Sequence, residues 1–191
     1  MNSSTANLEI EETAGPHGRV AIWFFLASEV VVFGGLLLSY VMVRLRYPNW
    51  ADFSAQTMTS IGFTNTMVLL TSSLFIVLAH HFSVEKNHKK SAFYMGLAIL
   101  CGFLFLGFKA FEYTHEIQKG ITPITNLFWS YYFFITGLHA VHVLIGIVVN
   151  IFIWKDVKNG KNLQRIEVAG LYWHFVDVVW LFVFPLFYVA N

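Results

Sequence analysis

The sequence has little charge, one cysteine and four prolines, and each scarcity limits what the protein can be. Charged residues make up 12% of the 191 residues, whereas a soluble globular domain typically carries about 25%. A chain with so little charge cannot cover itself with a polar surface, so its solvent is expected to be lipid. The formal net charge of +1 gives no electrostatic reason to expect binding to nucleic acid.

The shortage of cysteine and proline excludes further classes. The single cysteine, Cys101, excludes an internal disulfide and a multi-cysteine metal site, and its apolar neighbours predict a small buried side chain. A small transporter typically has broken helices near the membrane midplane and an internal repeat. Only Pro185 lies deep in an apolar run and no repeat is found in the sequence, so a transporter is not favoured.

Apolar residues are abundant instead, at 57% of the chain, and they gather in five long runs. A helix rises about 1.5 Å per residue, so roughly 20 residues cross a hydrocarbon core about 30 Å thick. Backbone groups in lipid must bond within their own segment, which requires helices. The predicted fold class is an all-α membrane protein, a bundle of five transmembrane helices at about 19–44, 61–83, 90–110, 127–155 and 167–190.

The charges at the ends of the apolar runs predict an orientation. Residues 1–18 are expected to form a polar N-terminal tail ahead of the transmembrane domain, residues 19–191, and the tail lacks the basic start of a secretory signal. Cytoplasmic loops of membrane proteins carry an excess of lysine and arginine. With the N-terminus in the cytoplasm, eight of the 12 basic residues lie inside and four outside. We therefore predict a cytoplasmic N-terminus and a periplasmic C-terminus.

Ionisable side chains within the apolar runs are the candidates for a buried polar or proton-linked site. Such a group costs at least ~2.5 kcal/mol in hydrocarbon and normally faces the bundle interior with a partner. Helical spacing allows several of them to lie in one layer. The layer is interpreted as a structural hydrogen-bond network that joins the first, fourth and fifth helices, or as a protonatable cluster. Its members are Glu29, His139, His142, His174 and Asp177.

The histidines also raise the alternative of a haem-b membrane anchor, which belongs to a different functional class. A six-coordinate haem needs two axial nitrogens that face each other at one depth. Counted from the helix ends, His139 and His174 differ in depth by about 12 Å, and His142 and His174 by about 7 Å. Since the clusters expected of a copper or zinc site are also absent from the sequence, no metal site is expected in this chain.

Other polar and aromatic residues are predicted to contact lipid or a partner subunit. Glu112 and His115 share a helical face just after the third apolar run and are interpreted as part of a solvated helix end. Tryptophans are enriched at the boundary of the membrane. The candidates for lipid or partner contact are Trp23, Arg44, Glu112, His115, Trp173 and Trp180.

Several segments resemble, in the same order, the signatures of one protein family. Residues 170–182 read GLYWHFVDVVWLF, residues 136–146 read TGLHAVHVLIG, and residues 23–30 read WFFLASEV. Phe111, Glu112 and Tyr113 match a further "EY" element. These motifs are similar to those of subunit III of haem-copper oxidases, and the chain resembles the short, five-helix bacterial form of cytochrome c oxidase subunit III.

The resemblance implies an accessory role in the aerobic respiratory chain. In this family haem and copper lie in subunits I and II, where oxygen is reduced and protons are pumped. Subunit III packs against subunit I, holds phospholipid, and supports proton uptake and sustained turnover. The resemblance therefore implies that this chain has no catalytic residue and no cofactor of its own, apart from bound phospholipid.

The resemblance also implies partners and a location. Subunit I is the expected direct partner, with subunit II, a small subunit IV and a respiratory supercomplex as further ones, in the bacterial cytoplasmic membrane. Many members have seven helices, and this chain lacks the first two. Lipid or helices of another subunit are expected to cover the side of the first helix, where Glu29 would face subunit I or lipid.

Alternatives within the superfamily are a quinol oxidase subunit and the related protein found with nitric oxide reductases. The Ser28–Glu29 pair favours the cytochrome c type.

Overall fold

The computed structural model describes residues 16–47, 50–160, 163 and 165–189. The predicted polar tail, residues 1–18, lies almost entirely outside this part of the chain. Within it the protein is all-helical, without strands. Five of its helices are long and apolar enough to cross a membrane, so the predicted class is confirmed.

The long helices are joined by short connections. The third of them was predicted to end near residue 110 but continues to Gln118, because the charged side chains at its end are buried and paired with one another. The long helices are α2 (Pro16–Arg44), α4 (Thr59–Val84), α5 (His88–Gln118), α6 (Leu127–Lys158) and α7 (Arg165–Phe184). The short elements are α3 (Trp50–Ser54) and a π-helical segment, η1 (Pro185–Val189), which directly continues α7.

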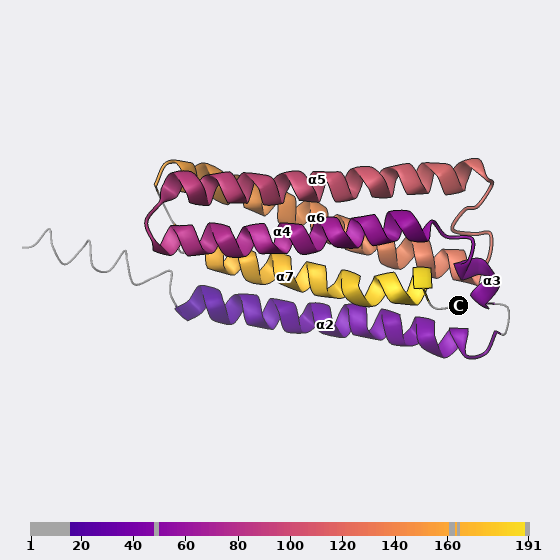
Figure 1. Ribbon diagram of the computed structural model, residues 1–191. Coiled ribbons are helices and arrows are strands. Elements are labelled where there is room, and N and C mark those ends of the chain that lie inside the picture. The colour runs from indigo at the N-terminus through magenta and orange to yellow at the C-terminus, as the bar shows by residue number, and fades with distance from the viewer. Residues whose placement is uncertain (1–15, 48–49, 161–162, 164, 190–191) are drawn as a thin grey trace, which may run out of the picture.

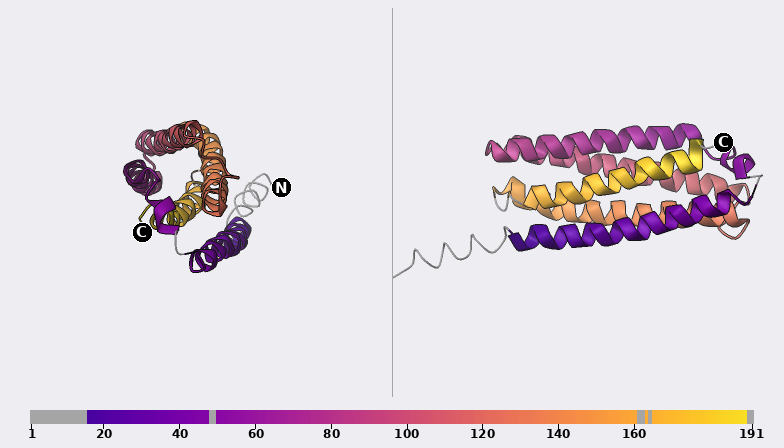
Figure 2. Two further views of the ribbon diagram at one scale, coloured as in Figure 1. Left: turned by 90° about the vertical axis from the view of Figure 1, so that its right-hand side faces the viewer. Right: turned by 90° about the horizontal axis from the view of Figure 1, so that it is seen from below.

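Helices α4 to α7 form a four-helix bundle, and α2 lies outside it against α7 and α6 (Figures 1 and 2). Helices α2, α5 and α7 run in one direction, and α4 and α6 run in the other. The end of the molecule where α2, α5 and α7 begin is called the N-terminal end of the bundle below. The opposite end, which holds α3 and η1, is called the C-terminal end.

Local signals in the sequence account for several helix ends. The Asn87 side chain accepts a hydrogen bond from the backbone N–H of Lys90, and Asn126 accepts one from that of Trp129, so each caps the start of a helix. Gly120 and Gly160 follow the ends of α5 and α6 with φ of 81° and 70°. Glycine adopts this left-handed conformation without the penalty that a Cβ would bring.

Trp173 fills the centre of the four-helix bundle because two neighbouring helices carry glycine there. A Cβ added at Gly102 of α5 would meet the indole ring at 2.9 Å, and one added at Gly146 of α6 would also meet it at 2.9 Å. The indole N–H donates to the hydroxyl of Ser72 in α4 at 2.9 Å. Small residues that let membrane helices approach closely are a usual means of packing in lipid.

The segment η1 is held by hydroxyl groups from three other elements. The last carbonyls of a helix lack partners within the helix. Here the hydroxyl of Tyr40 donates to the carbonyl of Leu186 at 2.9 Å, and that of Ser54 to Phe187 at 3.0 Å. The Thr59 hydroxyl donates to the carbonyl of Tyr188 at 3.1 Å. These bonds fix η1 to α2, α3 and α4 at the C-terminal end.

Gly102→Val is expected to destabilise the isolated chain in detergent by roughly 1–3 kcal/mol, the usual cost of overfilling a packed core. The added side chain would collide with Trp173 and Ile147. Gly107→Val in the same helix is the matched control, because a Cβ there meets nothing within 4 Å. Equal unfolding free energies for the two variants, measured by denaturant titration, would contradict the packing described.

Candidate functional site

Glu29 and His142 form a hydrogen-bonded pair between α2 and α6. The Oε2 atom of Glu29 lies 3.1 Å from Nε2 of His142, and the two side chains are 16% and 12% exposed. The other ring nitrogen, Nδ1, lies 2.8 Å from the carbonyl oxygen of Leu138. A carbonyl can only accept, so Nδ1 carries a hydrogen and donates it.

This geometry determines how many protons the pair holds. With Nδ1 protonated, Nε2 of a neutral imidazole is an acceptor, and the contact with Glu29 then requires a proton on the carboxyl group. If that proton moves to Nε2, the pair becomes a carboxylate and an imidazolium. In both forms one proton lies between Oε2 and Nε2, so α2 is joined to the bundle by a shared proton.

The pair is connected to α7 as well. The hydroxyl of Tyr172 donates to the backbone carbonyl of His142 at 3.0 Å. Ser28, next to Glu29, points elsewhere: it is exposed, and its hydroxyl donates to the carbonyl of Phe25 at 2.6 Å within its own helix. The Ser28–Glu29 pair of the sequence therefore does not act as one unit.

The other members of the predicted buried layer lie apart from this pair. His174 contacts the Ser73 hydroxyl through Nδ1 at 2.5 Å. His139 and Asp177 are buried, and neither the ring nitrogens nor the carboxylate oxygens have hydrogen-bond partners among the described residues. Helical spacing gives depth along the membrane but not which neighbour a side chain faces. Glu29 belongs to a helix outside the four-helix bundle, so the single layer that was predicted is divided.

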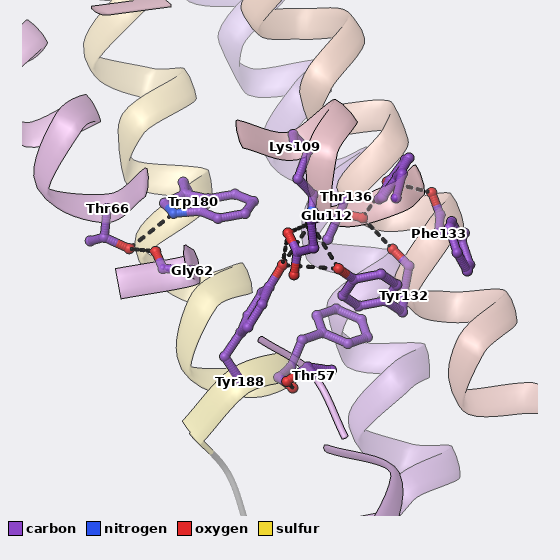
Figure 3. Close-up of polar contacts among 12 residues, drawn as sticks. Thr57, Gly62, Thr66, Lys109, Glu112, Tyr132, Phe133, Thr136, Trp180 and Tyr188 are labelled. Carbon is purple, nitrogen blue, oxygen red and sulfur yellow. Dashed lines mark hydrogen bonds and ion pairs between the residues drawn. The ribbon is translucent and has the colours of Figure 1, made fainter. Parts of the chain in front are cut away.

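A second polar cluster, which the sequence reasoning missed, lies inside the bundle near its C-terminal end (Figure 3). Lys109 and Glu112 of α5 form an ion pair with a distance of 2.9 Å between Nζ and Oε2. Lys109 also donates to the hydroxyl groups of Tyr132 at 3.0 Å and Tyr188 at 2.6 Å. Tyr188 in turn donates to Glu112 at 3.0 Å. The cluster therefore joins α5, α6 and η1.

The surroundings of Lys109 suit a charged ammonium group. Its three acceptors match the three hydrogens of a protonated lysine. Aromatic rings also surround Nζ, and the faces of such rings attract cations. Their centroids lie 4.6 Å away for Tyr132, 5.0 Å for Tyr113, 5.3 Å for Tyr188 and 5.5 Å for Trp180.

The interpretation of Glu112 as part of a solvated helix end is wrong, because its side chain is 0% exposed. The spacing of three between Lys109 and Glu112 was the available signal, since it places the two charges on one face. The same spacing is common on solvated helices, so only the three-dimensional arrangement distinguishes the two cases.

The tryptophans predicted to contact lipid or a partner fall into two groups. Trp23 of α2 is 61% exposed and remains a candidate. Trp173 and Trp180 are buried in the bundle, so the prediction is wrong for them. Each donates its indole N–H to α4, Trp173 to Ser72 and Trp180 to Thr66.

The two remaining contact candidates lie near the C-terminal end of the bundle. Arg44 is half-buried at the end of α2, and the half-buried ring of His115 stacks on Phe111 in α5. Both remain candidates for contact with lipid or a partner.

An apolar groove of about 470 Å³ separates α2 from α6 and α7 at the N-terminal end of the bundle. Its walls include Ile22 and Phe25 of α2 and Ile153 of α6, and Arg165 and Tyr172 of α7 also line it. Among the residues that the structure describes, no three His, Cys, Asp or Glu side chains converge in a way that could hold a metal ion.

Comparison with known proteins gives a match over nearly the whole chain. The family model described as cytochrome c oxidase subunit III matches residues 13–191, which confirms the resemblance seen in the sequence. The chain is 27% identical over 200 residues to the probable quinol oxidase subunit 3 of Staphylococcus aureus (strain USA300), covering 100% of this chain and 98% of the relative. The probable quinol oxidase subunit 3 of Staphylococcus haemolyticus (strain JCSC1435) gives the same values.

Lys109→Met is expected to destabilise the chain by roughly 3–5 kcal/mol, because it leaves the Glu112 carboxylate buried without its counter-ion. Lys109→Met combined with Glu112→Gln removes both charges and is expected to cost clearly less than the sum of the two single changes. The measurement is a double-mutant cycle of unfolding free energies in detergent.

Arg165→Met is the control, since Arg165 is 62% exposed, Asp156 is 34% exposed, and their bond is of the surface kind worth about 0–1 kcal/mol. Additive effects of the Lys109 and Glu112 substitutions would show that the pair is not a coupled unit.

Proposed function

The chain belongs to the cytochrome c oxidase subunit III family of haem-copper oxidases, and on this premise we propose how it serves its complex. In this proposal it is the accessory core subunit of a proton-pumping terminal oxidase in the bacterial cytoplasmic membrane. It packs on subunit I, holds phospholipid, and supports proton uptake and sustained turnover. Haem and copper lie in the partner subunits, and this chain carries no redox centre.

The observation that supports an accessory role is how the ionisable side chains inside the membrane are used. Glu29 is bound to His142, which joins α2 to α6, and the pair of Lys109 and Glu112 on α5 is joined to α6 and η1 through Tyr132 and Tyr188. Such pairs stabilise a rigid scaffold within the membrane. A rigid body of this kind suits a subunit that braces a catalytic neighbour.

The outer side of α2 is the face that we propose for contact with subunit I or with lipid. Phe24, Val31 and Leu38 recur every seven residues on this helix and are 75%, 74% and 63% exposed. Residues at this spacing lie on one side of a helix. Because α2 packs against the bundle mainly through α7 and α6, and through Tyr40 against η1, the opposite side is open to a neighbour.

The apolar groove between α2 and the bundle is the place that we propose for phospholipid. Its lining suits an acyl chain, and Arg165 supplies a positive charge at the boundary of the membrane where a phosphate group would lie. Arg165 also bonds Asp156 at 3.3 Å, which positions the guanidinium group beside the groove.

The distribution of basic residues supports a cytoplasmic N-terminal end. Lys109 is buried inside the bundle, so it no longer counts as a loop residue of the C-terminal end, which retains Arg44, Arg46 and Lys119. The N-terminal end is richer in lysine and arginine, as cytoplasmic surfaces are. Its described loops and helix ends carry Lys86, Lys89, Lys90, Lys155, Lys158 and Arg165.

Two electron donors are considered for the complex. The Ser28–Glu29 pair favours cytochrome c, in keeping with the description of the matching family. The similar Staphylococcus proteins carry the name of quinol oxidase subunits, which favours quinol. A copper-binding subunit II would indicate cytochrome c.

Gentle purification through a tag on this chain is the direct test. Subunits I and II, a reduced-minus-oxidised haem spectrum and co-purifying phospholipid are expected in the complex. When this chain is then separated from its partners, it is expected to show no Soret band. Haem retained by the separated chain would contradict the accessory role and favour the haem-b anchor.

Glu29→Gln is expected to leave assembly and haem content unchanged, because the amide can still donate to Nε2 of His142. It removes the shared acidic proton, so faster or slower inactivation during turnover, or altered proton pumping, is expected. Glu85→Gln is the control, since Glu85 is exposed and pairs with His81. Pumping and durability equal to the wild type in Glu29→Gln would remove its proposed role.

A further inference from the structure

A small notch opens between α4 and α7 at the N-terminal end of the bundle. Its volume is about 180 Å³, and three ionisable residues, His80, Glu167 and His174, line it among apolar neighbours. Ionisable side chains are costly in hydrocarbon and normally face a partner or a water-filled cavity. A notch lined by three such groups offers polar partners for water.

The notch slopes from the boundary of the membrane into its apolar part. His80 lies four residues before the end of α4, and Glu167 lies two residues after the start of α7. His174 is nine residues into α7, about 13 Å along the helix axis. The notch has room for several water molecules.

His174 connects the notch with the interior of the bundle. Its ring lines the notch, while its Nδ1 atom contacts the hydroxyl of Ser73 at 2.5 Å. The Ser73 side chain also lies near the carboxyl group of Asp177, whose two oxygens have no hydrogen-bond partner among the described residues. Asp177 is 4% exposed, and a buried carboxyl group without partners is expensive to maintain unless it takes up a proton or binds water.

We propose that the notch is a water-filled access path through which Asp177 exchanges a proton with the aqueous phase at the N-terminal end. Water in the notch gives a proton to Nε2 of His174, and Nδ1 releases its own proton to the Ser73 oxygen. Ser73 then passes its original hydroxyl hydrogen to the Asp177 carboxylate, which becomes a carboxylic acid. The reverse sequence returns the proton, so one proton moves and the serine and imidazole end uncharged.

Other titratable groups around Asp177 are already engaged or lie elsewhere. His142 on α6 is bonded to Glu29 of α2, and Lys109 on α5 to Glu112. Tyr188 of η1 belongs to the Lys109 cluster. His139 on α6 lies against the rings of Phe105 and Trp180. On α4 the nearest titratable group is His80, within the notch itself.

The hydration of the notch is tested by cysteine labelling of the chain in its native membranes, in a Cys101→Ala background. Leu171→Cys places a thiol in the notch. Phe93→Cys, at a position 62% exposed on α5 and at similar depth, places one toward lipid. Since thiolates form in water, a membrane-impermeant thiol reagent should label Leu171→Cys at least about tenfold faster. Labelling should occur only from the side of the N-terminal end. Equal rates, or labelling from the other side, would overturn the proposal.

The relay is tested by infrared spectroscopy of the purified complex in heavy water. Labelling with ¹³C-aspartate identifies the carboxylic acid bands of aspartates, and the aspartate band that Asp177→Asn abolishes is assigned to Asp177. His174→Phe and Ser73→Ala should slow the hydrogen–deuterium exchange of this band at least about tenfold, whereas His81→Phe, at an exposed histidine, should leave it unchanged. Exchange at the wild-type rate in both relay variants, or no Asp177 acid band, would refute the relay.

Discussion

The ion pair between Lys109 and Glu112 is the interaction on which the C-terminal end of the bundle depends. Burying either the lysine or the glutamate alone, away from water, would strongly destabilise the fold. Each charge is stabilised here because the other is present. Two tyrosine hydroxyls and four aromatic rings complete the environment of the ammonium group. Since these groups come from α5, α6, α7 and η1, the cluster joins three helices of the bundle and η1 at this end.

Several polar groups elsewhere find their partners within the chain. Trp173 and Trp180 bind hydroxyls of α4, and those hydroxyls bind backbone carbonyls, Ser72 that of Ala98 and Thr66 that of Gly62. Hydroxyls on the outside, such as Thr64 and Thr71, bond the carbonyl four residues earlier in their own helix. The indole bonds inside the bundle therefore join helices, while the hydroxyl bonds on the surface stay within one helix.

The sequence was sufficient for the fold class because five apolar runs of membrane-spanning length admit few alternatives. It was less informative about the site. Depth along each helix could be counted, and Glu29 and His142 do meet, but the direction of Asp177 depends on how α7 rotates against its neighbours. Charged residues were expected to contact water, and Glu112 was therefore wrongly predicted to be solvated. Tryptophans were expected at the membrane boundary, and Trp173 and Trp180 were therefore wrongly predicted to contact lipid or a partner. Both errors arise because pairing and packing across helices are not visible in one-dimensional spacing.

The position of Tyr188 has a consequence for biogenesis. It belongs to the last of the five spanning helices to leave the ribosome, yet it bonds both Glu112 and Lys109, a residue synthesised 79 positions earlier. While α5 and α6 enter the membrane, Lys109 therefore lacks the Tyr188 hydroxyl as a hydrogen-bond acceptor. A translocon or a neighbouring subunit that shelters these helices until synthesis reaches η1 would then serve as a temporary substitute for the missing hydroxyl group.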